Sequence, residues 1–142
     1  MTARSIVIEK DMPHPPEKIW RALTQSALLE EWLMKNDFEP VVGRKFNFRS
    51  TPMPQWNGVT DCEVLAVEPN KKLSYRWNSS GDKAKDGLRT IVTWTLTPTA
   101  TGTHLRMEQS GFRAEDEPFY QGANYGWQRM VGALEGVVAR LA

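Results

Sequence analysis

The chain has 142 residues, 40% of them hydrophobic, which suits a single globular domain spanning residues 1–142 with a substantial core. Eighteen basic and seventeen acidic residues nearly cancel, and no basic stripe or acidic tail is present, which argues against a nucleic-acid partner. The single cysteine, Cys62, excludes an internal disulfide and a cysteine-rich metal site. Together with the lack of a signal-like apolar segment, it favours a cytoplasmic location. No apolar run approaches the roughly 18 residues of a membrane-spanning helix.

The N-terminal part of the chain predicts one strand followed by two short helices. Residues 5–12 begin with three β-branched residues and are predicted to form a strand, which the following prolines end. The segments 17–24 and 27–34 each place their apolar residues on one helical face. Ser26 is the expected N-cap of the second helix.

The middle of the chain predicts consecutive strands. Phe46 and Phe48 alternate with polar residues, and similar alternation recurs in 73–77, 88–98 and 103–112. The connections are mostly of hairpin length, among them a polar hairpin at 78–87, so we expect an antiparallel meander.

Two segments of this region are less regular. Residues 59–68 form a strand of mixed phase, which a β-bulge or a strand covered on both sides would explain. Residues 50–58 hold two prolines and are predicted to be a loop. Its Met53 and Trp56 are large apolar side chains that a fully solvated loop does not need.

The C-terminal segment 117–141 predicts a long helix, with Asp116 as its cap and Pro118 in its first turn. Its glycines each weaken the helix by roughly 1 kcal/mol relative to alanine, so burial of its apolar stripe must stabilise it. Glycine also permits close approach of another element to the helix backbone. The stripe consists of Trp127, Met130, Leu134, Val138 and Leu141.

These elements predict an α+β fold. An antiparallel sheet of about six strands would curl around the long C-terminal helix, with two short helices after the first strand. The final helix is the only segment whose apolar stripe is long enough to cover one face of such a sheet.

Three stretches of the sequence carry motifs that point to one superfamily. PPEKIWRALT at 15–24 is followed by LEEW at 29–32; Gly58 leads through Glu68-Pro69 to LSYRW at 73–77; and Tyr125-Gly126-Trp127 precedes the apolar stripe of the last helix. Together they resemble the START-like (SRPBCC, birch-pollen-allergen-like) superfamily. The resemblance is strongest to the branch named after the C-terminal domain of the heat-shock-protein-90 ATPase activator, and it covers essentially the whole chain.

The resemblance implies a helix-grip fold with a cavity between the sheet and the last helix. Relatives use that cavity for lipids, sterols, polyketides or plant hormones. The full eukaryotic activator has a separate N-terminal domain that binds the chaperone. This chain has no room for one, which argues against a chaperone partner.

Catalytic and metal-ligating constellations are scarce in the sequence. His14 lies in a proline-rich turn, and His104 lies on the strand face opposite Leu105 and Met107, so both are expected to contact solvent. The chain has one cysteine and two histidines far apart in sequence, so it offers few residues from which a Cys-His or Ser-His-Asp site could be built. No phosphate loop or zinc-protease motif is present. The sequence therefore predicts no catalytic group, metal or cofactor.

The candidate site is the predicted cavity, where aromatic side chains would form the wall and Gln109 would orient a ligand oxygen. The alternative is that these side chains fill the space themselves. An empty void of about 300 Å³ would cost on the order of 7 kcal/mol, so we expect a pocket that is small, open to water or occupied. Arg76 is expected on the surface. The predicted lining residues are Trp32, Phe46, Phe48, Trp56, Trp77, Trp94, Met107, Gln109, Trp127, Met130 and Leu134.

Three functions remain open from the sequence. The first is a binding protein for a small hydrophobic or aromatic molecule. The second is a cyclase- or dehydratase-like enzyme using the same cavity, for which Asp61, Glu63 and Glu108 are the strand carboxylates to consider. The third is an interaction protein for a chaperone or for a second copy, where an exposed patch at Met53 and Trp56 would favour a homodimer.

Overall fold

The computed structural model describes residues 4–50, 58–79 and 88–141. Two short helices and a long C-terminal helix accompany a run of strands, and a short 3₁₀ helix, Ala114–Asp116, precedes the long helix. In chain order the elements are β1 (Arg4–Met12), α1 (Pro16–Thr24), α2 (Ser26–Trp32), β2 (Lys35–Asn36), β3 (Lys45–Arg49), β4 (Val59–Glu68), β5 (Lys72–Ser79), β6 (Arg89–Pro98), β7 (Thr103–Phe112) and α3 (Glu117–Arg140).

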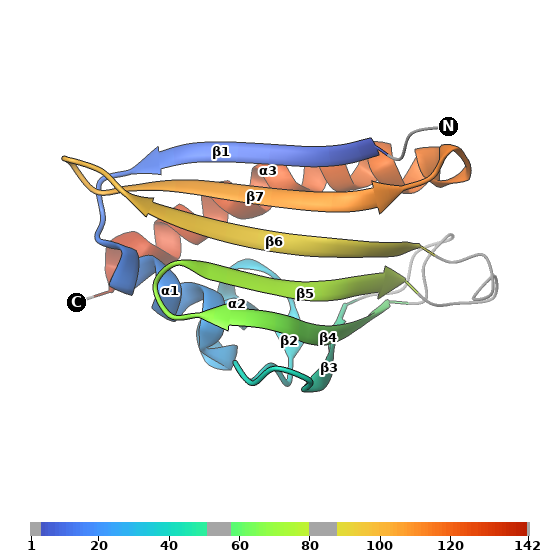
Figure 1. Cartoon of the computed structure of the whole chain (residues 1–142), viewed down its shortest axis with the longest axis horizontal. Coiled ribbons are helices and arrows are strands. Elements are labelled where there is room, and N and C mark those ends of the chain that lie inside the picture. Colours follow the sequence, from blue (N-terminus) through green and yellow to red (C-terminus); the bar gives the residue numbers. More distant parts are fainter. Residues whose placement is uncertain (1–3, 51–57, 80–87, 142) are drawn as a thin grey trace.

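The strands form one antiparallel sheet of seven, in the order β1-β7-β6-β5-β4-β3-β2. All three helices lie on the same face of this sheet, with α3 running behind β1 and β7 (Figure 1). The predicted α+β helix-grip architecture is confirmed, with seven strands in place of about six. The additional strand is β2, whose two residues are too short for alternation to reveal.

The apolar stripe of α3 packs against the sheet. Trp127, Leu134 and Val138 are buried as predicted, but Val131 points into the core where Met130 was expected, and Met130 is half-buried at the border. Leu141 lies just beyond the helix as its C-cap residue. Of the helices in the described part of the chain, none has both the length and the hydrophobicity that crossing a bilayer requires.

The glycines of α3 do not serve the close approach that we expected. A Cβ atom built at Gly122, Gly132 or Gly136 would have no described neighbour within 4 Å. At Gly126 the nearest atom is the terminal methyl of Met130, at 3.6 Å. This prediction was wrong because Gly122, Gly132 and Gly136 lie on the exposed side of the helix.

Strand β4 contains the predicted irregularity. Its register against β5 shifts between Val64, which pairs with Tyr75, and Ala66, which pairs with Ser74. Leu65 is therefore the extra residue of a β-bulge. Before the bulge the even-numbered side chains face the core, and after it Val67 packs there, which explains the mixed phase of the sequence.

Of the two predicted helix caps, Asp116 does occupy the N-cap position of α3, whereas the prediction for Ser26 is wrong by one residue. Asp116 makes no capping hydrogen bond to α3. Its carboxylate instead accepts hydrogen bonds of 2.8 and 3.0 Å from the backbone N–H and Nε of Arg113. Burial alone would raise the pKa of Asp116, but these bonds and the guanidinium charge lower that pKa below its usual value. Ser26 is the first residue of α2, after Gln25 at the N-cap, and its hydroxyl bonds to Asn36.

Candidate functional site

Those predicted lining residues that the structure describes lie together between the sheet and the helices. Trp56, like Met53 and most of the predicted hairpin at 78–87, lies outside the described residues. Met130 is half-buried. The others are buried: Trp32 on α2, Phe46 and Phe48 on β3, Trp77 on β5, Trp94 on β6, Met107 and Gln109 on β7, and Trp127 and Leu134 on α3.

The aromatic members of this set are in direct contact. The ring centroids of Trp77 and Trp127 are 5.1 Å apart, and those of Trp94 and Trp127 are 5.7 Å apart. Trp32 meets Trp94 edge to face at 5.6 Å, and Phe48 lies 5.2 Å from Trp77. These separations are typical of packed aromatic pairs, so indole and phenyl rings occupy the space beside α3 where the sequence predicted a cavity wall.

Several polar atoms of this aromatic cluster have partners within the protein. Nε1 of Trp127 donates to Oε1 of Gln109 at 2.6 Å, and Nε2 of Gln109 donates to Oγ1 of Thr90 at 2.9 Å. Trp94 donates to the hydroxyl of Tyr75 at 2.9 Å, and Trp32 to a backbone carbonyl of α1 at the same distance. Gln109 therefore bonds two side chains of the core.

Tyr75 and Phe38 belong to this cluster, although the sequence analysis did not select them. Phe46 lies 5.0 Å from Phe38 and 5.6 Å from Tyr75. Burial raises the pKa of the Tyr75 phenol. The phase of its strand could have identified Tyr75, because residues 75 and 77 lie on the same face of the strand as each other. Phe38 follows a strand of only two residues and has no such signal.

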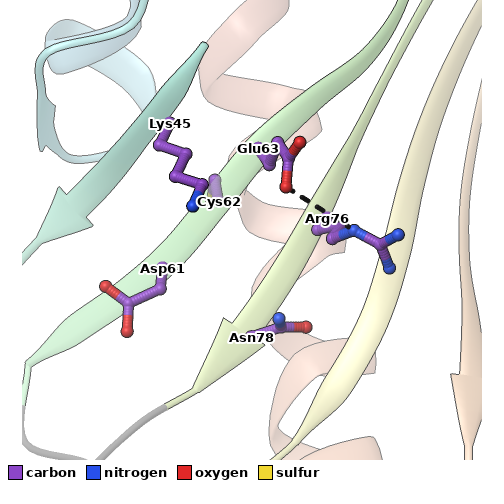
Figure 2. Close-up of a pocket in the computed structure, with 6 residues that line it drawn as sticks. All are labelled: Lys45, Asp61, Cys62, Glu63, Arg76 and Asn78. Atoms are coloured by element: carbon purple, nitrogen blue, oxygen red, sulfur yellow. Dashed lines mark ion pairs between the residues drawn. The ribbon is translucent and has the colours of Figure 1, made fainter. Parts of the chain in front are cut away.

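A first hollow, of ≈ 170 Å³, lies on β3, β4 and β5 (Figure 2). Lys45, Asp61, Glu63, Arg76 and Asn78 line it together with Cys62. Apart from Cys62, these residues alternate with buried ones along their strands, so their side chains point to the face of the sheet opposite the helices. Nε of Arg76 lies 3.9 Å from a carboxylate oxygen of Glu63.

The face of the sheet opposite the helices, which we call the outer face, offers this hollow no reactive thiol. Cys62 is buried, and burial raises the pKa of its thiol, which keeps it protonated and unreactive. Asp61 and Glu63 lie on this face, and Glu108 pairs there with Arg106 at 3.0 Å. The carboxylates that an enzyme hypothesis would use thus lie outside the aromatic cluster.

A second hollow, of ≈ 520 Å³, lies between the end of α2 and the edge of the sheet. We call it the α2–β3 hollow. Leu33 and Met34, which follow α2, are half-buried and pack against the core. The described residues that line it are Glu30, Leu33, Met34, Lys35, Arg49 and Ser50.

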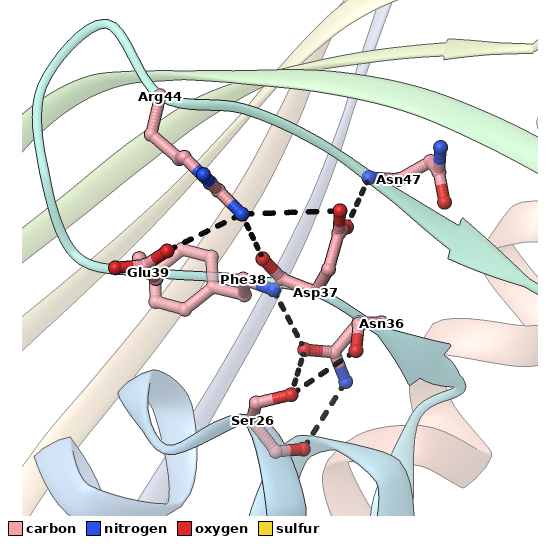
Figure 3. A network of polar contacts seen from close by, with 7 residues as sticks. All are labelled: Ser26, Asn36, Asp37, Phe38, Glu39, Arg44 and Asn47. Atoms are coloured by element: carbon pink, nitrogen blue, oxygen red, sulfur yellow. Dashed lines mark hydrogen bonds and ion pairs between the residues drawn. The ribbon is translucent and has the colours of Figure 1, made fainter.

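A network of hydrogen bonds centred on Asn36 fixes the frame of this hollow (Figure 3). Oγ of Ser26 lies 2.8 Å from Oδ1 of Asn36, and Nδ2 of Asn36 donates to the carbonyls of Ser26 and Met34 at 3.2 and 3.0 Å. The backbone N–H of Phe38 donates to the same Oδ1 at 3.1 Å. Strand β2 is thereby tied to α2.

The same network continues to β3. A carboxylate oxygen of Asp37 accepts a 3.0 Å hydrogen bond from the backbone N–H of Asn47. Arg44 lies 3.3 Å from a carboxylate oxygen of Glu39 (Figure 3). The sequence analysis missed the network, because its side chains come from a helix, a two-residue strand and a loop that share no periodic pattern.

Comparison with solved structures shows which proteins have this architecture. The chain is 56% identical to protein MLL2253 from Mesorhizobium loti, with 98% of this chain and 99% of that chain covered and a TM-score of 0.89. Bacillus halodurans protein BH1534 is 29% identical, with 97% and 99% covered and a TM-score of 0.77. The Aha1 dimer from Colwellia psychrerythraea is 24% identical, with 95% and 96% covered and a TM-score of 0.78.

Comparison with protein families gives a match over most of the chain. A search of curated proteins found no match. The family model described as Activator of Hsp90 ATPase homolog 1-like protein, in contrast, matches residues 13–139, which include α1, the whole run β2–β7 and α3 up to its last turn. The chain therefore belongs to the Activator of Hsp90 ATPase homolog 1-like protein family, a branch of the START-like superfamily.

Proposed function

We propose that this protein binds a small, largely apolar or aromatic molecule in the α2–β3 hollow. The observation that carries the proposal is the size of the hollow, together with the half-buried apolar side chains of Leu33 and Met34 in its lining. Its ≈ 520 Å³ falls within the range of about 300–1,000 Å³ typical of small-molecule sites, whereas the outer-face hollow of ≈ 170 Å³ falls below it. Leu33 and Met34 give a ligand apolar contact that continues into the core.

A site between the sheet and α3 remains a hypothesis for the same ligand class. A molecule there would have to displace rings that contact one another at 5.1–5.7 Å, or separate Trp127 from Gln109. Such displacement costs packing and a buried hydrogen bond, so the α2–β3 hollow is the better-supported position. A cytoplasmic location belongs to this proposal, supported by the unpaired thiol of Cys62.

The cyclase- or dehydratase-like alternative has less support. Acid–base chemistry needs a titratable group beside the substrate. Glu30 is the only carboxylate among the described residues of the α2–β3 hollow, and its side chain is exposed. Binding without turnover is therefore the simpler function.

Self-association is a second candidate. The Colwellia psychrerythraea Aha1 protein is a dimer in solution, and Tyr125 is 67% exposed on the outer side of α3 in this chain. Gel filtration with light scattering tests this candidate, and Tyr125→Ser should shift any dimer towards monomer. A chaperone partner stays a hypothesis that only the family name supports, to be tested by pull-down with purified chaperone.

The ligand proposal is tested with a neutral probe, 4-phenylbutanamide, followed by NMR of the methyl groups of Leu33 and Met34. We expect saturable shifts at both residues. Met34→Ala should weaken binding about tenfold, because roughly 1.5 kcal/mol of apolar burial is lost. Met130→Ala is the control, since Met130 is equally half-buried but lies on α3. Chemical-shift changes confined to the aromatic cluster would place the binding site there. The absence of saturable shift changes would refute the proposal.

A further inference from the structure

We infer that the ligand of the α2–β3 hollow carries an anionic group, a carboxylate, held by Lys35 and Arg49. The inference rests on the proposed function, because it assigns the chemical class of the molecule bound there. Lys35 is on β2, Arg49 ends β3, and both line the hollow.

The two cations stand directly opposite each other. Lys35 and Arg49 are register partners in the β2–β3 ladder, so their Cβ atoms are separated by about 4.5–5.5 Å. Both side chains lie on the face opposite that of Phe48, the buried residue next to Arg49. Like charges at directly opposed positions destabilise a strand pair, so this arrangement works against the stability of the ligand-free sheet edge.

No ion pair in the described part of the protein relieves this repulsion. Elsewhere in the described chain, Lys10, Arg44 and Arg106 lie 3.2, 3.3 and 3.0 Å from a carboxylate oxygen. For both Lys35 and Arg49, no carboxylate oxygen of a described residue lies within 4.0 Å of a side-chain nitrogen, the distance that defines an ion pair. A ligand carboxylate between them would supply the missing opposite charge and accept their N–H groups.

The backbone that carries the two cations is held on both sides. Asn36, next to Lys35, is fixed by its hydrogen bonds to Ser26, Met34 and Phe38. Phe48, next to Arg49, is fully buried. The backbone positions from which the two cationic side chains extend are therefore set before a ligand arrives, which lowers part of the entropic cost of binding.

The charge of the hollow selects the kind of anion. Lys35 and Arg49 contribute two positive charges and Glu30 one negative charge, so the described lining has a net charge of +1. That balance suits a monoanion. Leu33 and Met34 lie in the same hollow, so the anion is the carboxylate of an otherwise apolar molecule.

The test compares two probes of nearly the same shape by isothermal titration calorimetry, 4-phenylbutanoate and 4-phenylbutanamide. We expect the carboxylate to bind about tenfold more tightly at low salt, with the preference shrinking as sodium chloride is added. Lys35→Gln and Arg49→Gln should each reduce the preference at least threefold, with a smaller loss of affinity for the amide than for the carboxylate. Lys71→Gln is the control, because Lys71 lies far from the hollow. Arg49 pairs with Val59 at the start of β4, whereas Lys71 lies in the turn that follows the end of β4.

A second measurement needs no ligand. Removing one of two opposed cations should raise the melting temperature of the free protein by about 1–3 °C in Arg49→Gln, and Lys71→Gln should leave it unchanged. Equal affinity for both probes, or a preference that survives both substitutions, would refute the cation pair and leave the proposed function standing. If neither probe binds, the proposed function fails and the inference fails with it.

Discussion

The indole N–H of Trp127 donates a 2.6 Å hydrogen bond to Oε1 of Gln109, joining the middle of α3 to β7 inside the core. Gln109 is fully buried and passes a second bond to Thr90 on β6. One amide therefore links the long helix to two adjacent strands, and Trp127 is held in a fixed orientation among the aromatic rings.

We expect Gln109→Leu to lower the free energy of unfolding by about 1–3 kcal/mol. Leucine fills a similar volume, but it leaves the buried N–H of Trp127 without an acceptor. The loss of the hydrogen bond from Gln109 costs Thr90 less, because the Thr90 hydroxyl still donates to the carbonyl of Trp77 at 2.7 Å. Urea denaturation measures the change. Gln121→Leu on the exposed side of α3 should stay within about 0.5 kcal/mol of the parent, and equal stability of the two variants would contradict the role of Gln109.

Asn36→Ala should destabilise the protein by about 1.5–3 kcal/mol, because the side chain bonds Ser26, Met34 and Phe38 at once. It should also weaken binding of 4-phenylbutanamide, since β2 is no longer tied to α2. Thermal unfolding and calorimetry measure the two effects. Asn47→Ala is a matched control: its Oδ1 has no described hydrogen-bond partner, and its bond to Asp37 uses the backbone N–H. Equal losses in both variants would argue against the network.

Gly132→Ala should stabilise α3 by about 0.5–1 kcal/mol. The position is helical and exposed, and an added methyl meets no described atom within 4 Å. Gly102→Ala is expected to do the opposite, because its Cβ would lie 2.1 Å from the carbonyl oxygen of Met12. Melting temperatures at several protein concentrations check both. A loss of stability in Gly132→Ala that depends on concentration would instead indicate that this helix face contacts a second copy.

His104 should make stability depend on pH. Its ring nitrogens lie 3.0 Å from Glu9 and 2.7 Å from Asp11, and these hydrogen bonds raise the pKa of the imidazole above its ordinary value. A raised pKa in the folded state means that the stabilisation is complete below the unfolded pKa of about 6.5 and is lost as the pH rises through the folded pKa. The imidazolium can donate to both carboxylates, whereas the neutral ring can donate to only one.

The measurement is a comparison of melting temperatures between pH 5.5 and 9 for the parent and His104→Gln. The parent should lose more stability across this range than the variant. His14→Gln is the control, because His14 has no resolved contact with a carboxylate among the described residues. Parallel curves for the parent and His104→Gln would rule out the linkage.

Much of the fold could be predicted because periodicity reports which side of an element is buried. The alternation from Leu88 to Leu96 and the stripe through Trp127, Leu134 and Val138 both depend on that relation. The mixed phase of residues 59–68 was compatible with a bulge, which the structure places at Leu65. These are local patterns whose spacing follows directly from strand and helix geometry.

The candidate site was harder to predict because periodicity does not report what lies between two buried faces. The same Trp77 and Trp127 would fit the wall of a hollow or the packed interior, and only their 5.1 Å separation distinguishes the two. The α2–β3 hollow depends on Asn36 and on the pairing of Lys35 with Arg49, which join short segments through side-chain bonds and register. Neither relation leaves a repeat in the sequence.

The pairing of β1 with β7 has a consequence for synthesis of the chain. Ile6 and Gln109 are register partners although roughly a hundred residues separate them. On the ribosome, the first strand therefore waits unpaired until the segment that contains β7 has been made, with its edge open to other chains. Pairing of β1 with β7 follows the synthesis of β2–β6, so crowding of nascent chains should harm the yield of this protein more than that of a helical protein of equal length.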